Sequence, residues 1–220
     1  FYLLENYGRP ASAPELFSFA GINFYGSLCA ALLVTCVFSY LNNIKPLYLL
    51  DATAPGFMIA YCIGRLGCHV SGDGDWGRVN NMPKPFDWMP DGLWAYRYPH
   101  NLIREGSIMP RCDWGNYCYQ LDHPVFPTSL WEAIICFLLF LCLWRLRRTI
   151  AMPGVLFSIF LIFSGVERFL VEMIRINPVI NALNITQAQL ISILLILIGI
   201  IIMVTARKKD FVNKSTGLLS

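Results

Sequence analysis

Residues 64–77 read Gly-Arg-Leu-Gly-Cys-His-Val-Ser-Gly-Asp-Gly-Asp-Trp-Gly. Arg65 lies near the end of an apolar segment, which then gives way to a loop rich in glycine and aspartate. An unpaired guanidinium at membrane depth costs at least about 2.5–3.5 kcal/mol. We therefore expect Arg65 either to pair with a carboxylate or to bind an anionic ligand.

The composition indicates which solvent surrounds this arginine. Hydrophobic residues make up 56% of the 220-residue chain and charged residues only 14%, and the mean hydropathy is +0.52. These values lie outside the range of ordinary soluble domains. The net charge of +3 is modest, and the basic residues flank apolar segments, which favours a role in membrane orientation over nucleic-acid binding. The composition predicts an all-α polytopic membrane protein.

Five apolar segments approach the roughly 20 residues that a helix needs to cross a bilayer. They span residues 17–41, 49–70, 129–146, 153–173 and 188–206. The third segment is the shortest of the five. We expect five transmembrane helices.

Basic residues follow the first, third and fifth apolar segments. They are Lys45, Arg145, Arg147, Arg148, Arg207, Lys208 and Lys209. The positive-inside rule assigns these ends to the cytoplasm. The resulting organisation is an extracytoplasmic segment (1–16), two spans (17–70), a small irregular extracytoplasmic head (71–128), three spans (129–206) and a cytoplasmic tail (207–220).

Most of the eight cysteines fall inside the apolar segments, where free cysteine is an ordinary packing residue. Cys112 and Cys118 differ, because they lie in the predicted head and can form a local disulfide in an oxidising compartment. No cysteine spacing with companion histidines suggests a zinc site. We expect no metal.

The predicted topology gathers polar residues of four segments in the outer leaflet. They are Asn23, Tyr25, Arg65, Trp131, Glu132, Glu167, Arg168, Glu172 and Arg175. Three of them, Arg168, Glu172 and Arg175, are spaced i, i+4 and i+7 and therefore share one helix face. Two guanidiniums at matched depth, Arg65 and Arg168, suit a phosphate group because each offers a planar fork of donors. An anion reached from this leaflet suggests a phospholipid headgroup. Asp51, by contrast, is expected at the cytoplasmic end of its helix.

Residues 64–77 resemble the signature of the prolipoprotein diacylglyceryl transferases, Gly-Arg-x-Gly-Asn-Phe-x-Asn-x-Glu-x-x-Gly. Five further places in the chain are similar to family motifs, in the same order. They are residues 21–28, 51–55, 127–132 and 168–175, and Gln189. The chain is identified as a divergent member of that family by this run of matches.

Several positions depart from the family pattern. Tyr25 stands where many members have histidine, Cys68 and Ser71 replace the two asparagines of the signature, and Ser164 stands where the classical enzymes carry tyrosine. An extra residue leaves open whether Asp73 or Asp75 stands for the glutamate. The family usually has seven spans, so the resemblance predicts that the first two are missing from this chain.

The resemblance implies an activity in the bacterial cytoplasmic (inner) membrane. It is transfer of the sn-1,2-diacylglyceryl group of phosphatidylglycerol to the lipobox cysteine thiol of a prolipoprotein, with no cofactor, metal or nucleic acid. Arg65 and Arg168 would bind the donor and stabilise charge on the leaving phosphate. The thiol, with an ordinary pKa of about 8.5, must lose its proton. Tyr25, Glu172 and Asp75 stay open as proton acceptors.

The predicted site has two sets of residues. The catalytic residues are Arg65, Arg168, Tyr25 and Glu172. The substrate-binding residues are Asn23, Arg65, Cys68, Ser71, Asp73, Asp75, Gly77, Glu132, Arg168 and Arg175. Glu132 and Glu172 have a second interpretation, as fixed ionic partners that orient the arginines.

Three other interpretations compete with the transferase. A lipid-binding or accessory membrane protein would keep the arginines and lack the base. A transporter is disfavoured because its polar residues would lie near the midplane and at both ends. A histidine-based hydrolase is disfavoured because no Gly-x-Ser-x-Gly sequence is present, so His69 is expected to be a hydrogen-bonded residue near a helix end.

Overall fold

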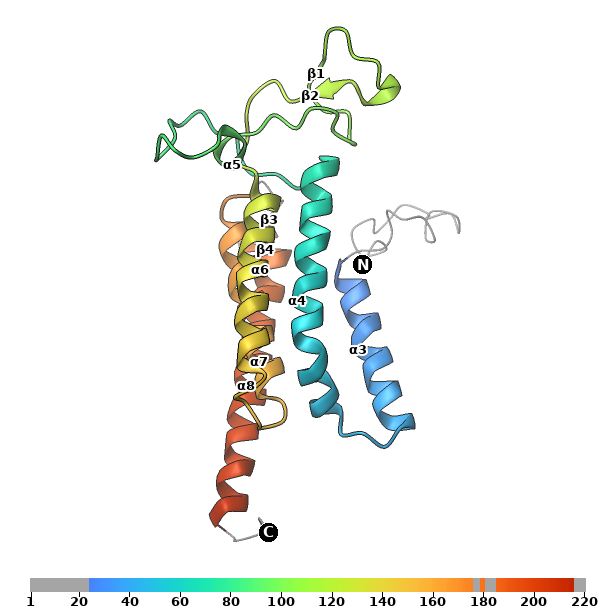
Figure 1. Ribbon diagram of the computed structural model, residues 1–220, viewed down its shortest axis with the longest axis vertical. Coiled ribbons are helices and arrows are strands. Elements are labelled where there is room, and N and C mark those ends of the chain that lie inside the picture. Colours follow the sequence, from blue (N-terminus) through green and yellow to red (C-terminus); the bar gives the residue numbers. More distant parts are fainter. Residues whose placement is uncertain (1–23, 176–178, 181–184, 216–220) are drawn as a thin grey trace. The chain divides into compact units, whose positions relative to one another are not determined.

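The computed structural model describes residues 24–175, 179–180 and 185–215 of the chain (Figure 1). Helices dominate the described residues, and three of them are long and apolar enough to cross a membrane: Pro46–Ser71, Thr128–Leu146 and Ala188–Lys208. The prediction of an all-α membrane protein is confirmed. The chain divides into two compact units, Phe1–Leu50 and Asp51–Ser220.

The long helices follow the five predicted apolar segments closely. They are α3 (Phe24–Leu41), α4 (Pro46–Ser71), α6 (Thr128–Leu146), α7 (Val155–Glu172) and α8 (Gln187–Ser215). The first predicted segment begins in residues 17–23, which lie outside the described residues. Helix α7 has 18 residues and contains three charged side chains near its end, which separates it from the more uniformly apolar helices.

The first unit contains α3 and the turn that follows it. Asn42 donates through Nδ2 to the carbonyl of Phe38 at 2.9 Å, and Asn43 has φ 53°, a left-handed conformation that asparagine tolerates well. Pro46 then opens α4 at the helix position where a missing N–H has no cost.

Asp51 ties α4 to α7 within the second unit. Its carboxylate accepts hydrogen bonds from the backbone N–H groups of Gly154 at 2.6 Å and Phe157 at 2.7 Å. Those N–H groups belong to the first turn of α7, where no partner within the helix exists. Asp51 is therefore an N-terminal cap supplied by a neighbouring helix, which agrees with its expected place at a helix end.

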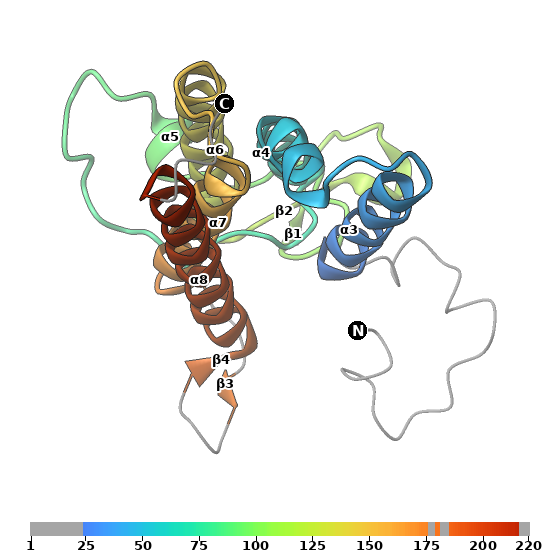
Figure 2. The ribbon, with the colours of Figure 1, turned by 90° about the horizontal axis from the view of Figure 1, so that it is seen from below.

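Helices α7 and α8 pack closely side by side (Figure 2). A Cβ on Gly165 would lie 2.7 Å from Ile196, and one on Gly199 would lie 2.8 Å from Ile162. Small residues allow helix backbones to approach in this way in membrane proteins. This contact fixes which face of α7 points away from α8.

The segment between α4 and α6, residues 72–127, is here called the head segment. It holds α5 (Asp91–Trp94), the 3-10 helix η2 (Gly115–Tyr117) and a two-stranded antiparallel sheet. Strand β1 (Ser107–Ile108) pairs with β2 (Tyr119–Gln120), with Ser107 opposite Gln120. Tyr98, Leu121 and Val125 form its small apolar core.

A disulfide joins Cys112 to Cys118 within the head segment. The sequence left this disulfide open, and the structure shows that it is formed. A second short hairpin, β3 (Val179–Ile180) with β4 (Ile185–Thr186), precedes α8.

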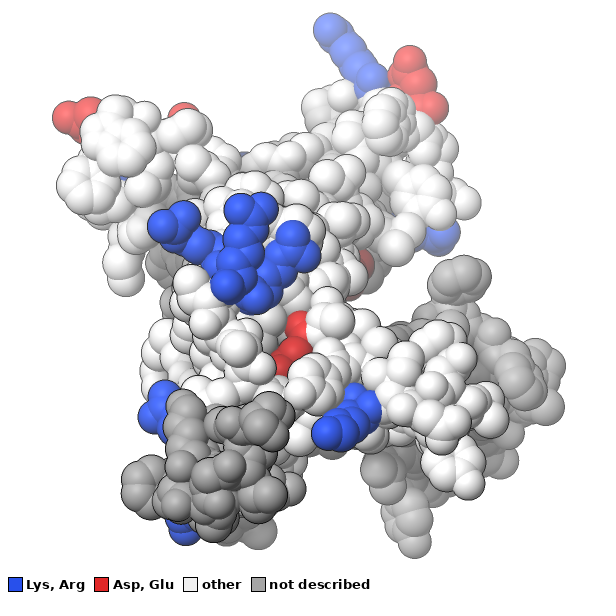
Figure 3. Space-filling view, turned by 60° about the horizontal axis from the view of Figure 1, so that its bottom comes forward, with Lys and Arg blue, Asp and Glu red and all other residues white. Residues whose placement is uncertain are grey.

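Basic side chains gather where α6 ends and α7 begins (Figure 3). Arg145, Arg147 and Arg148 are exposed there, and the Arg147 guanidinium lies 3.2 Å from the centre of the Trp144 ring. This end of α6 is opposite to the end that meets the head segment.

Candidate functional site

A cluster of charged side chains lies where α4, α6 and α7 meet the head segment. Arg65 comes six residues before the end of α4, Glu132 is the fifth residue of α6, and Arg168 and Glu172 lie in the last turns of α7. Arg175 follows α7 and forms a backbone bridge with Gly77. Residues more than 100 positions apart in sequence are therefore brought to one end of the helices.

Glu132 is the centre of this cluster. Its side chain has no exposed surface, and Oε2 forms an ion pair with Arg65 Nε at 2.7 Å and accepts a hydrogen bond from the Tyr61 hydroxyl at 3.0 Å. Arg168 Nη1 lies 3.6 Å from the same oxygen, and Arg175 Nη1 lies 3.7 Å from Oε1. One buried carboxylate thus holds three guanidiniums, which is the arrangement expected of a fixed ionic partner.

Asp75 is the second carboxylate of the cluster, and it forms ion pairs with Arg65 and Arg175. Burial alone would raise the pKa of Asp75, but the Arg175 and Arg65 guanidiniums outweigh burial and hold that pKa below its ordinary value. Asp73 instead accepts a hydrogen bond from the backbone N–H of Asp75 at 3.3 Å. Of the two aspartates that the sequence left open, Asp75 is the one that contacts the arginines.

Two glycines bring Asp75 to this position. Gly72 ends α4 with φ 60°, and a Cβ there would lie 2.9 Å from the Cβ of Asn101. A Cβ on Gly77 would lie 2.9 Å from Phe126 and Thr128, at the start of α6. Any larger residue at either position would displace the turn that carries Asp75.

Arg168 is the most exposed of the three arginines, with 18% of its side chain accessible against 9% for Arg65 and 6% for Arg175. It lies 3.6 Å from both Glu132 and Glu172. Arg65 and Arg168 contact the same oxygen of Glu132, so the two guanidiniums that were predicted to bind a phosphate group together lie side by side.

Glu167 is a fourth acid beside the cluster, and it is not among the site residues predicted from the sequence. It is 4% exposed, and neither carboxylate oxygen has a hydrogen-bond partner among the described residues. The charges of Glu132, Arg168 and Arg65 act on it. Its signal in the sequence was an ionisable residue within an apolar segment, directly before Arg168.

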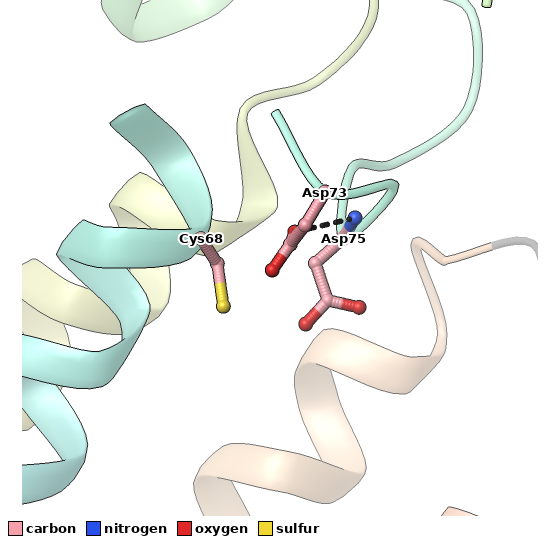
Figure 4. A group of neighbouring side chains, drawn as sticks. All are labelled: Cys68, Asp73 and Asp75. Carbon is pink, nitrogen blue, oxygen red and sulfur yellow. Dashed lines mark hydrogen bonds between the residues drawn. The ribbon is translucent and has the colours of Figure 1, made fainter. Parts of the chain in front are cut away.

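Cys68, Asp73 and Asp75 converge where α4 meets the head segment (Figure 4). The cysteine sulfur and one oxygen of each carboxylate lie within 4.8 Å of one another, a spacing that a metal ion can bridge. However, Asp75 is already engaged by two guanidiniums, whose positive charge opposes a cation at this position. The donor set therefore fits a cation poorly.

The remaining predicted residues have different outcomes. Ser71 donates through Oγ to the carbonyl of Cys68 at 3.3 Å, at the end of α4. Tyr25 belongs to α3, but its side chain lies outside the described part of the structure, and Asn23 lies outside the described residues altogether. Their predicted roles stay predictions.

Comparison with known proteins gives one consistent answer. The sequence model of the prolipoprotein diacylglyceryl transferase family matches residues 1–205. The chain is 30% identical over 209 residues to the phosphatidylglycerol--prolipoprotein diacylglyceryl transferase of Streptococcus mutans serotype c, covering 94% of this chain and 69% of that protein. It is 33% identical over 187 residues to the protein of that name from Lactococcus lactis subsp. cremoris, covering 84% and 62%.

A third relative of the same name, from Leptospira interrogans, is 29% identical over 222 residues, with 87% of this chain and 61% of the relative covered. The chain therefore spans 61% to 69% of the length of these relatives. Because the family model covers nearly the whole chain, this protein belongs to the prolipoprotein diacylglyceryl transferase family.

Proposed function

We propose that this protein transfers the diacylglyceryl group of phosphatidylglycerol to the lipobox cysteine thiol of a prolipoprotein. The observation that carries the proposal is the meeting of Arg65, Arg168 and Arg175 at one end of the helices, in a chain of this family. Relatives that match most of the chain are named for this reaction.

The donor is a phosphate diester, and guanidiniums bind phosphate oxygens through paired N–H donors. Each arginine of the cluster is held by carboxylates, so phosphate has to replace one of them. Asp75 is suited to leave because 31% of its side chain is exposed, whereas Glu132 is fully buried. Glu132 would keep the arginines aligned while the phosphate takes the place of Asp75.

The reaction breaks the S–H bond of the thiol and a C–O bond of the donor, and it forms an S–C bond and a bond from the proton to a basic group. The thiol loses its proton, the sulfur attacks the glyceryl carbon, and the bond between that carbon and the phosphate oxygen breaks. The electron pair of that bond leaves with glycerol phosphate. Arg65, which loses Asp75 as a partner, and the neighbouring Arg168, the most exposed of the three arginines, would stabilise the negative charge that grows on the leaving phosphate, which is where preorganised positive charge lowers a barrier most.

The same proposal includes an orientation in the membrane. The exposed arginines Arg145, Arg147 and Arg148 lie at the end of α6 remote from the head segment (Figure 3). The positive-inside rule favours a cytoplasmic position for that end. The head segment and the arginine cluster then face outward, in a multi-pass protein of the bacterial cytoplasmic membrane that meets lipobox-containing signal peptides at its outer surface.

The test is a transfer assay with the purified chain in vesicles that contain phosphatidylglycerol. A synthetic lipobox peptide should gain the mass of a diacylglyceryl group, and Arg168→Ala should lower the rate by at least about 100-fold, as loss of a single transition-state donor does elsewhere. Arg147→Ala is the matched control, because it removes a guanidinium from the opposite end of the helices.

Two outcomes would overturn the proposal. Binding of phosphatidylglycerol without any peptide modification would favour a lipid-binding accessory protein. Full transfer by the Arg168→Ala protein would contradict the role given to the arginines.

A further inference from the structure

A second polar bridge joins α4 to α6, one turn beyond the ion pair of Arg65 with Glu132. His69 Nδ1 lies 3.2 Å from the Tyr98 hydroxyl, and that hydroxyl lies 3.2 Å from Ser129 Oγ. The bridge runs from α4 through the head segment to the first turn of α6.

The two bridges have matching positions on both helices. His69 is four residues after Arg65, and Ser129 is three residues before Glu132, so each pair shares a helix face. At 1.5 Å per residue, His69 lies about 6 Å beyond Arg65 along the helix axis. A side chain at this distance can reach a reacting atom whose phosphate partner contacts the arginines.

Aromatic rings hold His69 in place. Its ring centre lies 5.2 Å from that of Tyr96 and 5.3 Å from that of Tyr98, while Trp76 lies 5.0 Å from Tyr98 on the other side. His69 itself is only half-buried. The ring is therefore oriented by packing, and His69 keeps part of its surface exposed.

Tyr98 keeps its proton in the neutral range. Burial raises the pKa of Tyr98 to about 12, with the hydrogen bond to Ser129 acting in the opposite direction. Its hydroxyl can therefore donate to Ser129 Oγ while accepting from the Nδ1–H of His69. That arrangement leaves Nε2 as the proton-accepting nitrogen of the ring, because the hydrogen bond at one nitrogen decides the state of the other.

Two of the other groups suggested as bases, Asp75 and Glu172, are engaged by guanidiniums. Asp75 forms ion pairs with Arg65 and Arg175, and Glu172 lies 3.6 Å from Arg168. Proton transfer to either carboxylate would remove the partner of a buried arginine. Within the described residues His69 has one hydrogen bond, through Nδ1, and accepting a proton at Nε2 leaves that bond intact.

We propose that His69 accepts the proton of the acceptor thiol, with Tyr98 and Ser129 as positioning residues. This inference rests on the proposed function. The S–H bond breaks and its proton moves to Nε2, the S–C bond forms, and the C–O bond of the donor breaks with its electron pair on the phosphate oxygen. The imidazolium then returns its proton to the departing phosphate ester or to water.

Several charged or titratable groups surround His69. Tyr96 and Tyr98 contact its ring, Arg65 and Cys68 lie within four residues of it on α4, and the charges of Asp73 and Asp75 act on its partner Tyr98. The test has to separate the role of His69 from theirs.

The first measurement compares His69→Ala with the unmodified chain in the vesicle assay. General-base loss should lower kcat/KM by at least about 100-fold at pH 7, with phosphatidylglycerol affinity unchanged. Imidazole added to the buffer should restore part of the rate. His100→Asn is the matched control: His100 is also half-buried and bonds through Nδ1 to a backbone carbonyl, and its replacement should leave the rate unchanged with or without imidazole.

The second measurement is the pH profile. The rate of the His69→Ala protein should rise about tenfold per pH unit up to about pH 8.5, where the thiol ionises without help. The unmodified chain should show a flatter profile, so that the two rates converge. His69→Gln, which keeps a polar side chain of similar size, should show the same profile and guards against a folding defect of the alanine variant.

The outcomes distinguish this inference from the function on which it rests. No transfer by the unmodified chain would end the proposed function itself. Normal transfer by both His69 variants, or a loss that neither imidazole nor alkaline pH relieves, would overturn the role of His69 alone.

Discussion

Arg65 Nε lies 2.7 Å from Glu132 Oε2, and this contact joins α4 to α6 where both meet the head segment. The carboxylate is fully buried and lies within 3.7 Å of the guanidiniums of Arg168 and Arg175 as well. Because removing one member of a buried ion pair leaves the other charges uncompensated, Glu132 should matter for both folding and activity.

Replacing Glu132 by glutamine should lower the free energy of unfolding by about 3–5 kcal/mol, the usual cost of breaking a buried ion pair. Chemical denaturation in detergent, followed by tryptophan fluorescence, would measure it. Glu105→Gln changes an acid in the head segment, away from the three arginines, and should alter stability little. Equal effects for the two variants would contradict the central position of Glu132.

Replacing Glu167 by methionine should leave stability unchanged or raise it. Both oxygens of this buried carboxylate lack a hydrogen-bond partner in the described part of the chain, and an apolar side chain of similar volume removes two unsatisfied polar atoms. The same denaturation experiment gives the sign. A loss of more than about 2 kcal/mol would mean that Glu167 has a partner in the native protein.

Asp75 should make stability depend on pH in acid. Its folded-state pKa is lowered, so its ionised form stabilises the fold above the unfolded-state value of about 3.9, and this contribution is lost as the pH falls through the folded-state pKa. Asp75→Asn should therefore lower the free energy of unfolding by about 2 kcal/mol at pH 7. Denaturation curves of both proteins should converge towards about pH 2; a constant difference would argue against the ion pairs.

Asp51→Ala should reduce stability without altering the affinity for phosphatidylglycerol. Losing the two N–H contacts at the start of α7 should cost about 1–2 kcal/mol. Asp51 is 14 residues before Arg65, or about 21 Å along α4, so it lies far from the arginine cluster. Vesicle binding and thermal unfolding, measured on the same preparation, would separate the two effects. Weaker lipid binding at a temperature where the Asp51→Ala protein is fully folded would contradict a purely structural role for Asp51.

The positions of the long helices were predictable because few backbone conformations are stable in the hydrocarbon core of a membrane. A backbone crossing hydrocarbon must satisfy its hydrogen bonds within its own segment, so apolar runs of about 20 residues become helices. The arginine residues were predictable as site candidates for a related reason: Arg65 and Arg168 interrupt apolar segments, where an ionisable side chain is costly unless it has a partner.

The partner of each arginine was not predictable to the same degree. Asp73 and Asp75 are two residues apart and chemically identical, and the close approach of Gly77 to Phe126 decides that Asp75 meets the guanidiniums. Glu167 was not predicted as a site residue because its burial depends on how α7 is rotated about its own axis. That rotation is set by the contact of Gly165 with α8.

The amino-acid sequence on its own therefore determined a helical membrane protein, its family and the arginines of its charged cluster, since these follow from local composition and motif spacing. Tertiary structure alone decided which carboxylate binds which arginine, and it alone brought His69, Tyr98 and Ser129 into one chain of hydrogen bonds. The two ends of that chain, His69 and Ser129, are 60 positions apart in sequence (129 − 69), and only the packing of α4, the head segment and α6 brings its members within hydrogen-bond distance.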